Sequence, residues 1–349
     1  MSRPIGYYVH HHGDGHRQRA IALCRSLGSV TLLGTGLMAR TEGLPCLELP
    51  DDRLDDGFWG IDGSQRPLSL HYAPLDHEGI RQRTALIAAW IAQARPRLIV
   101  VDVSAEVAML ARLASVPTVY VRLNGRRLDA AHLEAFRGAT ALLAPFHEAL
   151  DDDEIPGWIR KKTIYAPGIV RSARSEAIER DGDVLIVLGR GGGISDGNRW
   201  AEIARATPER KFRIIGPCTA PASFPDNLEL RGWVEDADAQ IAASAVVIGG
   251  GGDGVVSAVL SARRPFICVL EPRAFDEQVS KAEKLSAVGG AIACFEWPPA
   301  GDWPGMINQA IERARCWPDC LMDTGGAEPI ARWLNDLAGT SPADRSRAT

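Results

Sequence analysis

Two glycine-rich turns occupy corresponding places in the two halves of the chain, and each could hold a phosphate group. The first runs from His10 to His16 with the sequence HHHGDGH, and the second runs from Gly249 to Gly254 with the sequence GGGGDG. Each follows an apolar run and precedes a helical pattern. Free N–H groups at such a turn, with the helix dipole, attract an anion, and glycine lets the backbone approach it closely. Two such turns predict two nucleotide-binding folds that face each other across a cleft and take a nucleotide-linked substrate.

Four histidines gather in the first turn: His10, His11, His12 and His16. They could form a metal site, but no carboxylate or cysteine except Asp14 lies at a helpful local spacing, so we expect no bound metal. For His10 and His11 the simpler interpretation is a packed histidine and a surface residue. His16 differs because it opens the helix directly after a glycine turn, which makes it the candidate for chemistry.

A third glycine-containing segment, Gly189-Arg190-Gly191, follows an apolar run at 184–188. Ligands of parallel α/β sheets bind beyond the carboxyl ends of the strands, so this segment would face the cleft. The guanidinium of Arg190 suits a two-point grip on a phosphate. The alternative is an arginine in a solvated loop. We include Gly189, Arg190 and Gly191 in the predicted donor site.

Apolar runs that alternate with helical patterns supply the scaffold for these turns and predict parallel sheets in an α/β fold. The strands expected in the first half are 5–9, 30–33, 98–101, 118–121 and 139–144. The last of these would end the first domain. A charged, weakly patterned stretch at 151–182 indicates the linker, and strands resume at 184–188. The expected units are an N-terminal acceptor domain over 1–165, a C-terminal donor domain over 180–327, and a terminal helix with a disordered tail over 328–349.

The length, composition and net charge of the chain exclude several classes of protein. A length of 349 residues favours two domains, and 46% hydrophobic with 24% charged residues is ordinary for a globular protein with a core. A net charge of -5 without a basic stripe argues against a nucleic-acid partner. No apolar run is long enough to span a bilayer, and the N-terminus has no signal-peptide pattern. The 7 cysteines are scattered, which predicts reduced thiols and a cytoplasmic location.

The order of features from Leu230 to Cys294 resembles the C-terminal domain of GT-B glycosyltransferases. It reads Gly-Trp-Val, acidic residues, a helix, a strand, the glycine run, a helix, Arg-Arg-Pro, a strand, Glu-Pro and then Glu277-Gln278. It is most similar to the peptidoglycan N-acetylglucosaminyl transferases, which carry the glycosyltransferase family 28 C-terminal domain, and to the glucuronosyl transferases. The resemblance implies two Rossmann-like domains facing a central cleft, with a nucleotide sugar bound mainly by the second domain.

The resemblance also implies roles for individual residues. Glu277 and Gln278 would hold sugar hydroxyls, and Trp233 and Val234 would flank the base. The residues that would cradle the diphosphate are Gly250, Gly251, Gly252, Asp253 and Gly254. The families often have His-Gly-Gly where this chain has Gly250-Gly251-Gly252, and Ala258 stands where they carry a ribose-binding glutamate. Backbone binding of phosphate survives both changes, but the nucleotide preference stays open.

The first turn resembles that of the peptidoglycan transferases, which ends in Gly-Gly-His. It also resembles the Gly-x-Gly-His-x-x-Arg turn of the nucleotide-sugar hydrolases of pseudaminic acid synthesis, matched here by residues 13–19. In both families the histidine faces the cleft. An inverting sugar transfer needs a base for the acceptor hydroxyl, and a histidine with an ordinary pKa near 6.5 suits this task. We expect His16 to be the base with Asp14 or Asp102 orienting it, and His12, Gly13 and Gly15 to lie on the acceptor side.

The function predicted is transfer of a sugar from a nucleoside-diphosphate sugar, with UDP as first choice, to a small-molecule or lipid-linked acceptor. We expect an inverting reaction without metal or cofactor. The aromatic residues of 51–77 (Phe58, Trp59, His71 and Tyr72) either stack on the acceptor or pack against the domain. A lipid-linked acceptor would bring peripheral membrane contact. The oligomeric state stays open.

Three alternative functions remain. The first is a nucleotide-sugar hydrolase in which His16 activates water, which the match at 13–19 supports. The second is an epimerase, which needs cleft carboxylates that the sequence does not locate. The third is a non-catalytic nucleotide-binding protein, which Ala258 favours.

Overall fold

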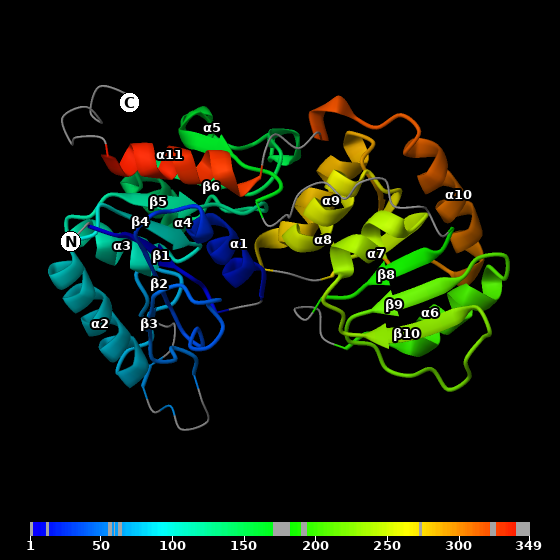
Figure 1. The fold of residues 1–349 in the computed structure, drawn as a ribbon, viewed down its shortest axis with the longest axis horizontal. Helices are drawn as coiled ribbons and strands as arrows, with labels where there is room; N and C mark the ends of the chain where they lie inside the picture. Colours follow the sequence, from blue (N-terminus) through cyan, green and yellow to red (C-terminus); the bar gives the residue numbers. More distant parts are fainter. Residues whose placement is uncertain are drawn as a thin grey trace.

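The computed structural model describes residues 3–11, 14–54, 58, 60–61, 65–169, 182–189, 194–271, 274–321 and 326–339. Two parallel sheets, each flanked by helices, form two α/β domains (Figure 1). The predicted fold class, α/β with two Rossmann-like domains, is confirmed.

The first sheet has seven parallel strands in the order β3-β2-β1-β4-β5-β6-β7. The strands are β1 (Ile5–Tyr8), β2 (Val30–Gly34), β3 (Cys46–Glu48), β4 (Leu98–Asp102), β5 (Thr118–Val121), β6 (Ala141–Ala144) and β7 (Thr163–Tyr165). The helices are α1 (Asp14–Arg25), α2 (Glu78–Ala94), α3 (Ala105–Leu113), α4 (Ala130–Gly138) and α5 (Gly157–Lys162), with a 3₁₀ turn η1 (Glu148–Leu150). Strands β1 and β4 are neighbours near the centre, so their carboxyl ends meet at one edge of the sheet.

The second sheet has six parallel strands in the order β10-β9-β8-β11-β12-β13. The strands are β8 (Val184–Val187), β9 (Phe212–Ile215), β10 (Leu228–Gly232), β11 (Val246–Gly249), β12 (Phe266–Val269) and β13 (Ile292–Cys294). The helices are α6 (Gly197–Ala206), α7 (Ala237–Ala243), α8 (Asp253–Ala262), α9 (Glu277–Ala287) and α10 (Trp303–Arg313), with 3₁₀ turns η3 (Ala274–Asp276), η4 (Ala300–Asp302) and η5 (Asp319–Leu321).

Both faces of each sheet are buried, which explains why the strands read as apolar runs rather than alternating ones. On β1, Tyr7 packs with Ile21 of α1 on one face, whereas Tyr8 packs with Ile87 of α2 on the other. The same division holds in the second domain, where Leu185 and Ile186 of β8 belong to different cores. Each sheet is thus fixed from both sides, and the turns at its carboxyl edge are held at defined positions.

The expectation that 139–144 ends the first sheet is wrong, because β7 adds a further strand beside β6. This strand and α5 fall within the stretch interpreted as linker. The charged pattern misled us because some of these charges are buried and paired: Asp151 accepts two hydrogen bonds from Arg122, at 2.9 and 2.7 Å. Tyr165 of β7 also donates a hydrogen bond to Asp151. A three-residue strand is too short to show a periodicity of its own.

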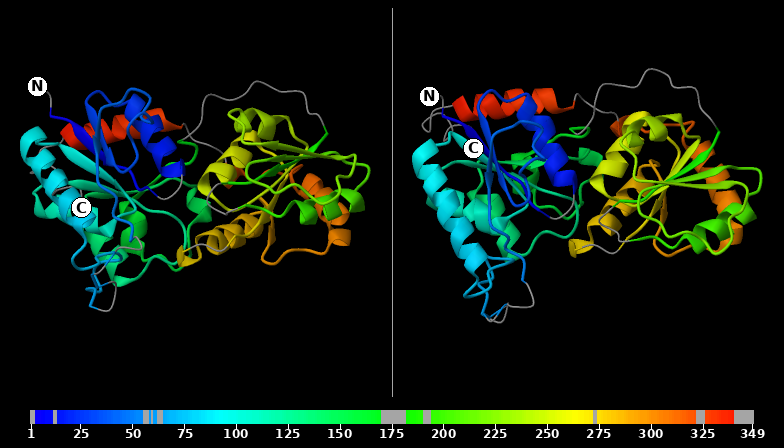
Figure 2. Two further views of the ribbon diagram at one scale, coloured as in Figure 1. Left: turned by 90° about the horizontal axis from the view of Figure 1, so that it is seen from below. Right: turned by 60° about the horizontal axis from the view of Figure 1, so that its bottom comes forward.

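The last helix, α11 (Ala327–Gly339), returns to the first domain. Its residues Ile330 and Leu334 are buried in the same core as Leu23 of α1. Two further views show this helix beside the first domain, away from the second sheet (Figure 2). The tail predicted to be disordered, 341–349, lies outside the described residues. Among the helices of the described part of the chain, none combines the length and apolar character that crossing a bilayer requires.

Candidate active site

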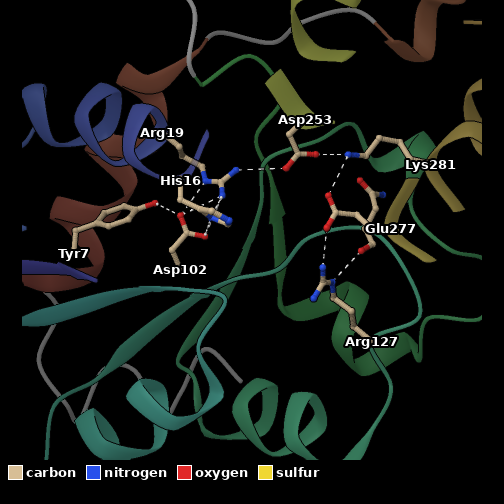
Figure 3. Close-up of polar contacts among 9 residues, drawn as sticks. Tyr7, His16, Arg19, Asp102, Arg127, Asp253, Glu277 and Lys281 are labelled. Atoms are coloured by element: carbon tan, nitrogen blue, oxygen red, sulfur yellow. Dashed lines mark hydrogen bonds and ion pairs between the residues drawn. The ribbon is translucent and has the colours of Figure 1, made fainter. Parts of the chain in front are cut away.

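His16 and Asp102 meet at the carboxyl edge of the first sheet. Helix α1 begins two residues before His16, and Asp102 is the last residue of β4, the neighbour of β1. The Nδ1 atom of His16 lies 3.0 Å from Oδ1 of Asp102 (Figure 3). Asp102 is fully buried, and the His16 side chain is 15% exposed. The two residues therefore form a dyad with the imidazole at the edge of the domain.

Asp14, the other partner considered for His16, is engaged elsewhere. It binds Arg17 through both carboxylate oxygens, at 2.7 and 2.8 Å, and its Oδ1 lies 2.9 Å from Nη2 of Arg40. Gln18 donates a further hydrogen bond to it. Asp14 thus ties the start of α1 to the loop after β2, and the structure brings Asp102 rather than Asp14 to His16.

The carboxylate of Asp102 has two more partners inside the domain. Tyr7 donates to Oδ2 at 3.3 Å, and Arg19 donates from Nε at 3.2 Å and from Nη2 at 3.0 Å. Burial alone would raise the pKa of Asp102, but the charges of Arg19 and His16 outweigh it and hold the pKa below its usual range. Asp102 is therefore ionised at neutral pH. When it accepts the Nδ1 proton of His16, the Nε2 atom is left free to take a proton.

His10 and His11 sit beside this dyad. The ring of His10 stacks on His11 with centroids 4.8 Å apart and lies 5.5 Å from the ring of His16. Burial, helped by these two rings, lowers the pKa of His10 to about 3, so it is neutral at pH 7. His11 is not the surface residue we expected, because its side chain is 19% exposed and lies 3.3 Å from Asp52. These two histidines therefore pack next to His16 without adding a positive charge.

In the second domain the predicted phosphate turn follows β11 directly. Helix α8 begins at Asp253, and Gly252 is its N-cap residue, with no side chain capping the helix. A Cβ added to Gly252 or Gly254 would meet nothing within 4 Å, so there is open space beside these two residues. A helix N-terminus next to open space can receive an anion.

Gln278 supports this turn from behind. Its side chain is 3% exposed, and its Oε1 accepts hydrogen bonds from the backbone N–H groups of Gly251 and Glu271, at 3.1 and 2.9 Å. A Cβ on Gly251 would come within 3.2 Å of Gln278, which explains the glycine there. The amide oxygen of Gln278 is thus occupied by the protein backbone.

Asp253 pairs with two cations, one from each domain. Lys281 of α9 is fully buried and forms an ion pair with its Oδ1. Across the domain boundary, Nη1 of Arg19 lies 3.5 Å from Oδ2 of Asp253 (Figure 3). Burial opposes ionisation, but Lys281 and Arg19 keep the pKa of Asp253 below its usual range. The structure therefore places this aspartate as a link between the two predicted turns.

The segment before α9 makes a second link between the domains. Glu277 binds Arg127 of the first domain, with 2.9 Å between Oε2 and Nη2. The backbone N–H of Arg126 donates to the carbonyl of Phe275 at 2.7 Å, and the Arg127 guanidinium lies 4.7 Å from the Phe275 ring. Both predicted sugar-binding positions, Glu277 and Gln278, therefore lie beside the domain boundary, and Glu277 forms an ion pair with the first domain.

The other predicted site residues are more dispersed. Trp233 is half-exposed, and Val234 packs against the core of the second domain. Gly189 and Gly15 are exposed, and an added Cβ would meet nothing within 4 Å at either. Ala258, which replaces the ribose-binding glutamate of the resembling families, is buried in the core. The predicted residues that lie outside the described part of the chain are His12, Gly13, Trp59, Arg190 and Gly191.

Sequence reasoning missed a cluster of His71, Asp129 and His132, whose side-chain atoms have metal-ligand chemistry and lie within 4.8 Å of one another. Hydrogen bonds account for the arrangement. Asp129 binds His71 Nε2 at 2.7 Å and His132 Nδ1 at 2.5 Å. Arg127 lies 3.3 Å from His132 Nε2, so that nitrogen accepts and Nδ1 carries the proton. With Nδ1 protonated, His132 offers no lone pair to a metal between these groups.

Arg19, Lys281 and Arg127 were also missed as parts of the site. Arg19 stands three residues after His16 in the matched Gly-x-Gly-His-x-x-Arg turn, so the two side chains share one face of α1. This spacing is the signal that could have found it. Lys281 and Arg127 carry no such signal, because a buried cation has the same letter in a sequence as a solvated one.

No protein-family model and no curated protein sequence matches the chain. Solved structures do match over nearly its whole length. The spinosyn rhamnosyltransferase SpnG has a TM-score of 0.69 and 15% identity over 95% of this chain and 100% of its own. MurG of Acinetobacter baumannii has a TM-score of 0.64 and 14% identity over 95% of this chain and 99% of its own. The glycotransferase of kitacinnamycin has a TM-score of 0.67 and 15% identity over 96% of this chain and 100% of its own. The chain therefore has the GT-B fold.

Proposed function

We propose that the protein is an inverting glycosyltransferase that moves a sugar from a nucleoside-diphosphate sugar to an acceptor hydroxyl. The observation that carries the proposal is the His16–Asp102 dyad, 3.0 Å apart, at the sheet edge that faces the glycine turn of the second domain. Arg19 binds Asp102 and also reaches Asp253 at the start of that turn, so the candidate base and the candidate donor site are neighbours. The solved GT-B transferases support a sugar-transfer chemistry for this arrangement.

The reaction follows from these positions. Nε2 of His16 takes the proton of the acceptor hydroxyl while the hydroxyl oxygen attacks the anomeric carbon of the donor from the face opposite the diphosphate. The bond between that carbon and the diphosphate oxygen breaks, and the diphosphate leaves with the electron pair. Asp102 stabilises the imidazolium that forms. Backbone N–H groups at the N-terminus of α8, beginning at Gly252, receive the charge of the leaving group. The proposal needs neither metal nor cofactor, and it keeps Arg190 as a further phosphate ligand.

Binding of nucleotides tests the donor site before any acceptor is known. The panel is UDP, dTDP, GDP, ADP and CMP. Because SpnG has also been solved with thymidine diphosphate, dTDP and UDP are tested first. A ligand at a hundred times its dissociation constant stabilises the folded protein by about 2.7 kcal/mol. Selective thermal stabilisation by one diphosphate supports the proposal. If none of the five stabilises the protein, the donor-site assignment fails.

The acceptor domain offers apolar surface to a lipid-linked acceptor. Leu54, Ile61, Leu68 and Leu75 are 38%, 46%, 86% and 50% exposed along the segment after β3. We therefore include lipid-linked acceptors and vesicles in the acceptor screen. Saturation by a soluble acceptor alone, with no vesicle binding, would remove membrane contact from the proposal.

A nucleotide-sugar hydrolase is the second candidate, because the full Gly-x-Gly-His-x-x-Arg match includes the buried Arg19 beside His16. In that reaction His16 would deprotonate water instead of an acceptor. Release of free sugar at the full rate in the absence of acceptor would favour the hydrolase, whereas release that depends on acceptor supports the transferase.

A further inference from the structure

Arg19 is a buried arginine that contacts both domains and both members of the dyad. Its side chain is 4% exposed. Nε and Nη2 donate to the carboxylate of Asp102, at 3.2 and 3.0 Å, and Nη2 also lies 3.0 Å from Nδ1 of His16. On its other side Nη1 lies 3.5 Å from Asp253 of the second domain. No role for this side chain follows from the proposed transfer reaction itself.

The first consequence concerns charge. A buried carboxylate without a cation would attract a proton onto His16 and hold the imidazole in its charged form. Burial opposes the charge of Arg19 as well, but Asp102, Tyr7 and Asp253 raise the pKa of Arg19 above its usual range, so it stays a cation. The guanidinium thus offsets part of the negative charge that Asp102 presents to His16.

The second consequence concerns the tautomer of His16. Both Oδ1 of Asp102 and Nη2 of Arg19 lie 3.0 Å from Nδ1. If Nδ1 carries the proton and donates to Asp102, Nε2 is free. If Arg19 donates to Nδ1 instead, the proton resides on Nε2, which then cannot act as a base. The position of the guanidinium therefore decides which nitrogen is available, and the contact with Asp253 helps to fix that position from the second domain.

We propose that Arg19 is a positioning residue that sets the proton-accepting state of His16 through Asp102, and that Asp253 of the second domain anchors it. The proposal rests on the proposed function in taking His16 as the base. The protonation state of His16 then depends on the contact between the two domains, because Asp253 belongs to the glycine turn of the second domain.

The charged groups that pair with His16 or with its partners include Asp102 of β4, Arg19 of α1 itself, and Asp253 of α8 with its partner Lys281 of α9. The titratable neighbours are His10, which stays neutral above about pH 3, and Tyr7, whose hydroxyl donates to Asp102. Removing Arg19 takes away the positive charge beside Asp102, whereas removing the Asp253 carboxylate releases the guanidinium without removing its charge. The first change should raise the proton affinity of His16, and the second should change which of its nitrogens carries the proton.

The test is nuclear magnetic resonance of the full chain labelled with ¹⁵N-histidine, without substrate, with the His16 signals assigned by their loss in His16→Asn. Arg19→Gln removes the charge but keeps hydrogen-bond donors, and Arg19→Lys keeps the charge as the matched control. We expect the protonation midpoint of His16 to rise by about one pH unit in R19Q, a tenfold change in proton affinity. In R19K it should stay near the native value. The native protein should show the Nδ1–H tautomer, and in Asp253→Asn, where the guanidinium is no longer anchored, this tautomer should be less populated.

An unchanged midpoint in folded R19Q, or an unchanged tautomer population in folded D253N, would overturn the proposal. Circular dichroism of each variant checks folding. If R19Q does not fold, D253N still decides the matter, because an unchanged population of the Nδ1–H tautomer contradicts the anchor. The readout needs no turnover. If the shifts occur but no nucleotide sugar is consumed, the proposed function fails while this inference stands. If nucleotide sugar is consumed but the shifts do not occur, this inference fails while the proposed function stands.

Discussion

Gly125 of the first domain lies directly against the carbonyl oxygen of Phe275 in the second. A Cβ at Gly125 would come 2.4 Å from that oxygen, and the residue has φ +100°, a conformation that suits glycine. The backbone N–H of the next residue, Arg126, donates to the same carbonyl. Close approach of two backbones therefore joins the domains beside the Arg127–Glu277 ion pair.

Substitution of Gly125 by alanine should disrupt the contact between Gly125 and the Phe275 carbonyl. We expect Gly125→Ala to destabilise the protein by about 1–3 kcal/mol, because the added methyl group meets the Phe275 carbonyl and strains the backbone. Thermal melting measures the loss, and small-angle scattering should show a larger radius of gyration. Gly138→Ala is the matched control, since a Cβ there meets nothing within 4 Å. Equal melting temperatures of the two variants would show that the contact contributes nothing.

Lys281 should be costly to remove because it neutralises a buried aspartate. Lys281→Met leaves Asp253 without its nearest cation, and such a loss costs about 3–5 kcal/mol. Lys284→Met on the same helix is the control, because its partner Asp153 is 90% exposed and such a pair contributes about 0–1 kcal/mol. Urea denaturation measures both. The double variant Lys281→Met/Asp253→Asn should recover stability relative to Lys281→Met. A cost no larger than that of Lys284→Met would contradict the neutralising role.

His10 should make the protein less stable in mild acid. Burial lowers the pKa of His10 to about 3 in the folded protein, below its ordinary 6.5, so between these values the unfolded chain binds a proton that the folded chain does not. Its contribution is full above pH 6.5 and is lost as the pH falls toward 3. From pH 7 to pH 5 the loss is about 2 kcal/mol. Denaturation at both pH values should show this loss in the native protein and a smaller one in His10→Gln. Identical losses would mean that His10 does not contribute.

The fold followed from sequence because its strands are continuous apolar runs, buried on both faces of parallel sheets. Not every part followed. The strands at Cys46–Glu48 and Thr163–Tyr165 have only three residues each, the second in a charged context, and the partner of α11 lies more than 300 residues away along the chain, in α1. Local patterns record which face of an element is apolar, but not which distant element covers it.

The sequence likewise predicted some residues of the candidate site and missed others. His16 and Asp102 could be proposed because helix starts after glycine turns and the ends of parallel strands meet at one sheet edge. Gln278 was assigned to sugar binding, but its amide oxygen is held by Gly251 and Glu271. Arg19 and Lys281 escaped notice because their burial depends on Asp102 and Asp253, which are distant in sequence. Charges become part of a site through pairing in three dimensions, and a single sequence does not show the pairs.

The most direct test of the account is release of nucleoside diphosphate from a panel of UDP- and dTDP-sugars, with and without acceptors, by the native protein and by His16→Ala. The account predicts release that depends on an acceptor in the native protein. It also predicts a loss of about 10²–10⁴-fold in His16→Ala, with thermal stabilisation by the nucleotide unchanged. Full turnover by His16→Ala with intact donor binding would contradict the assignment of His16 as the base.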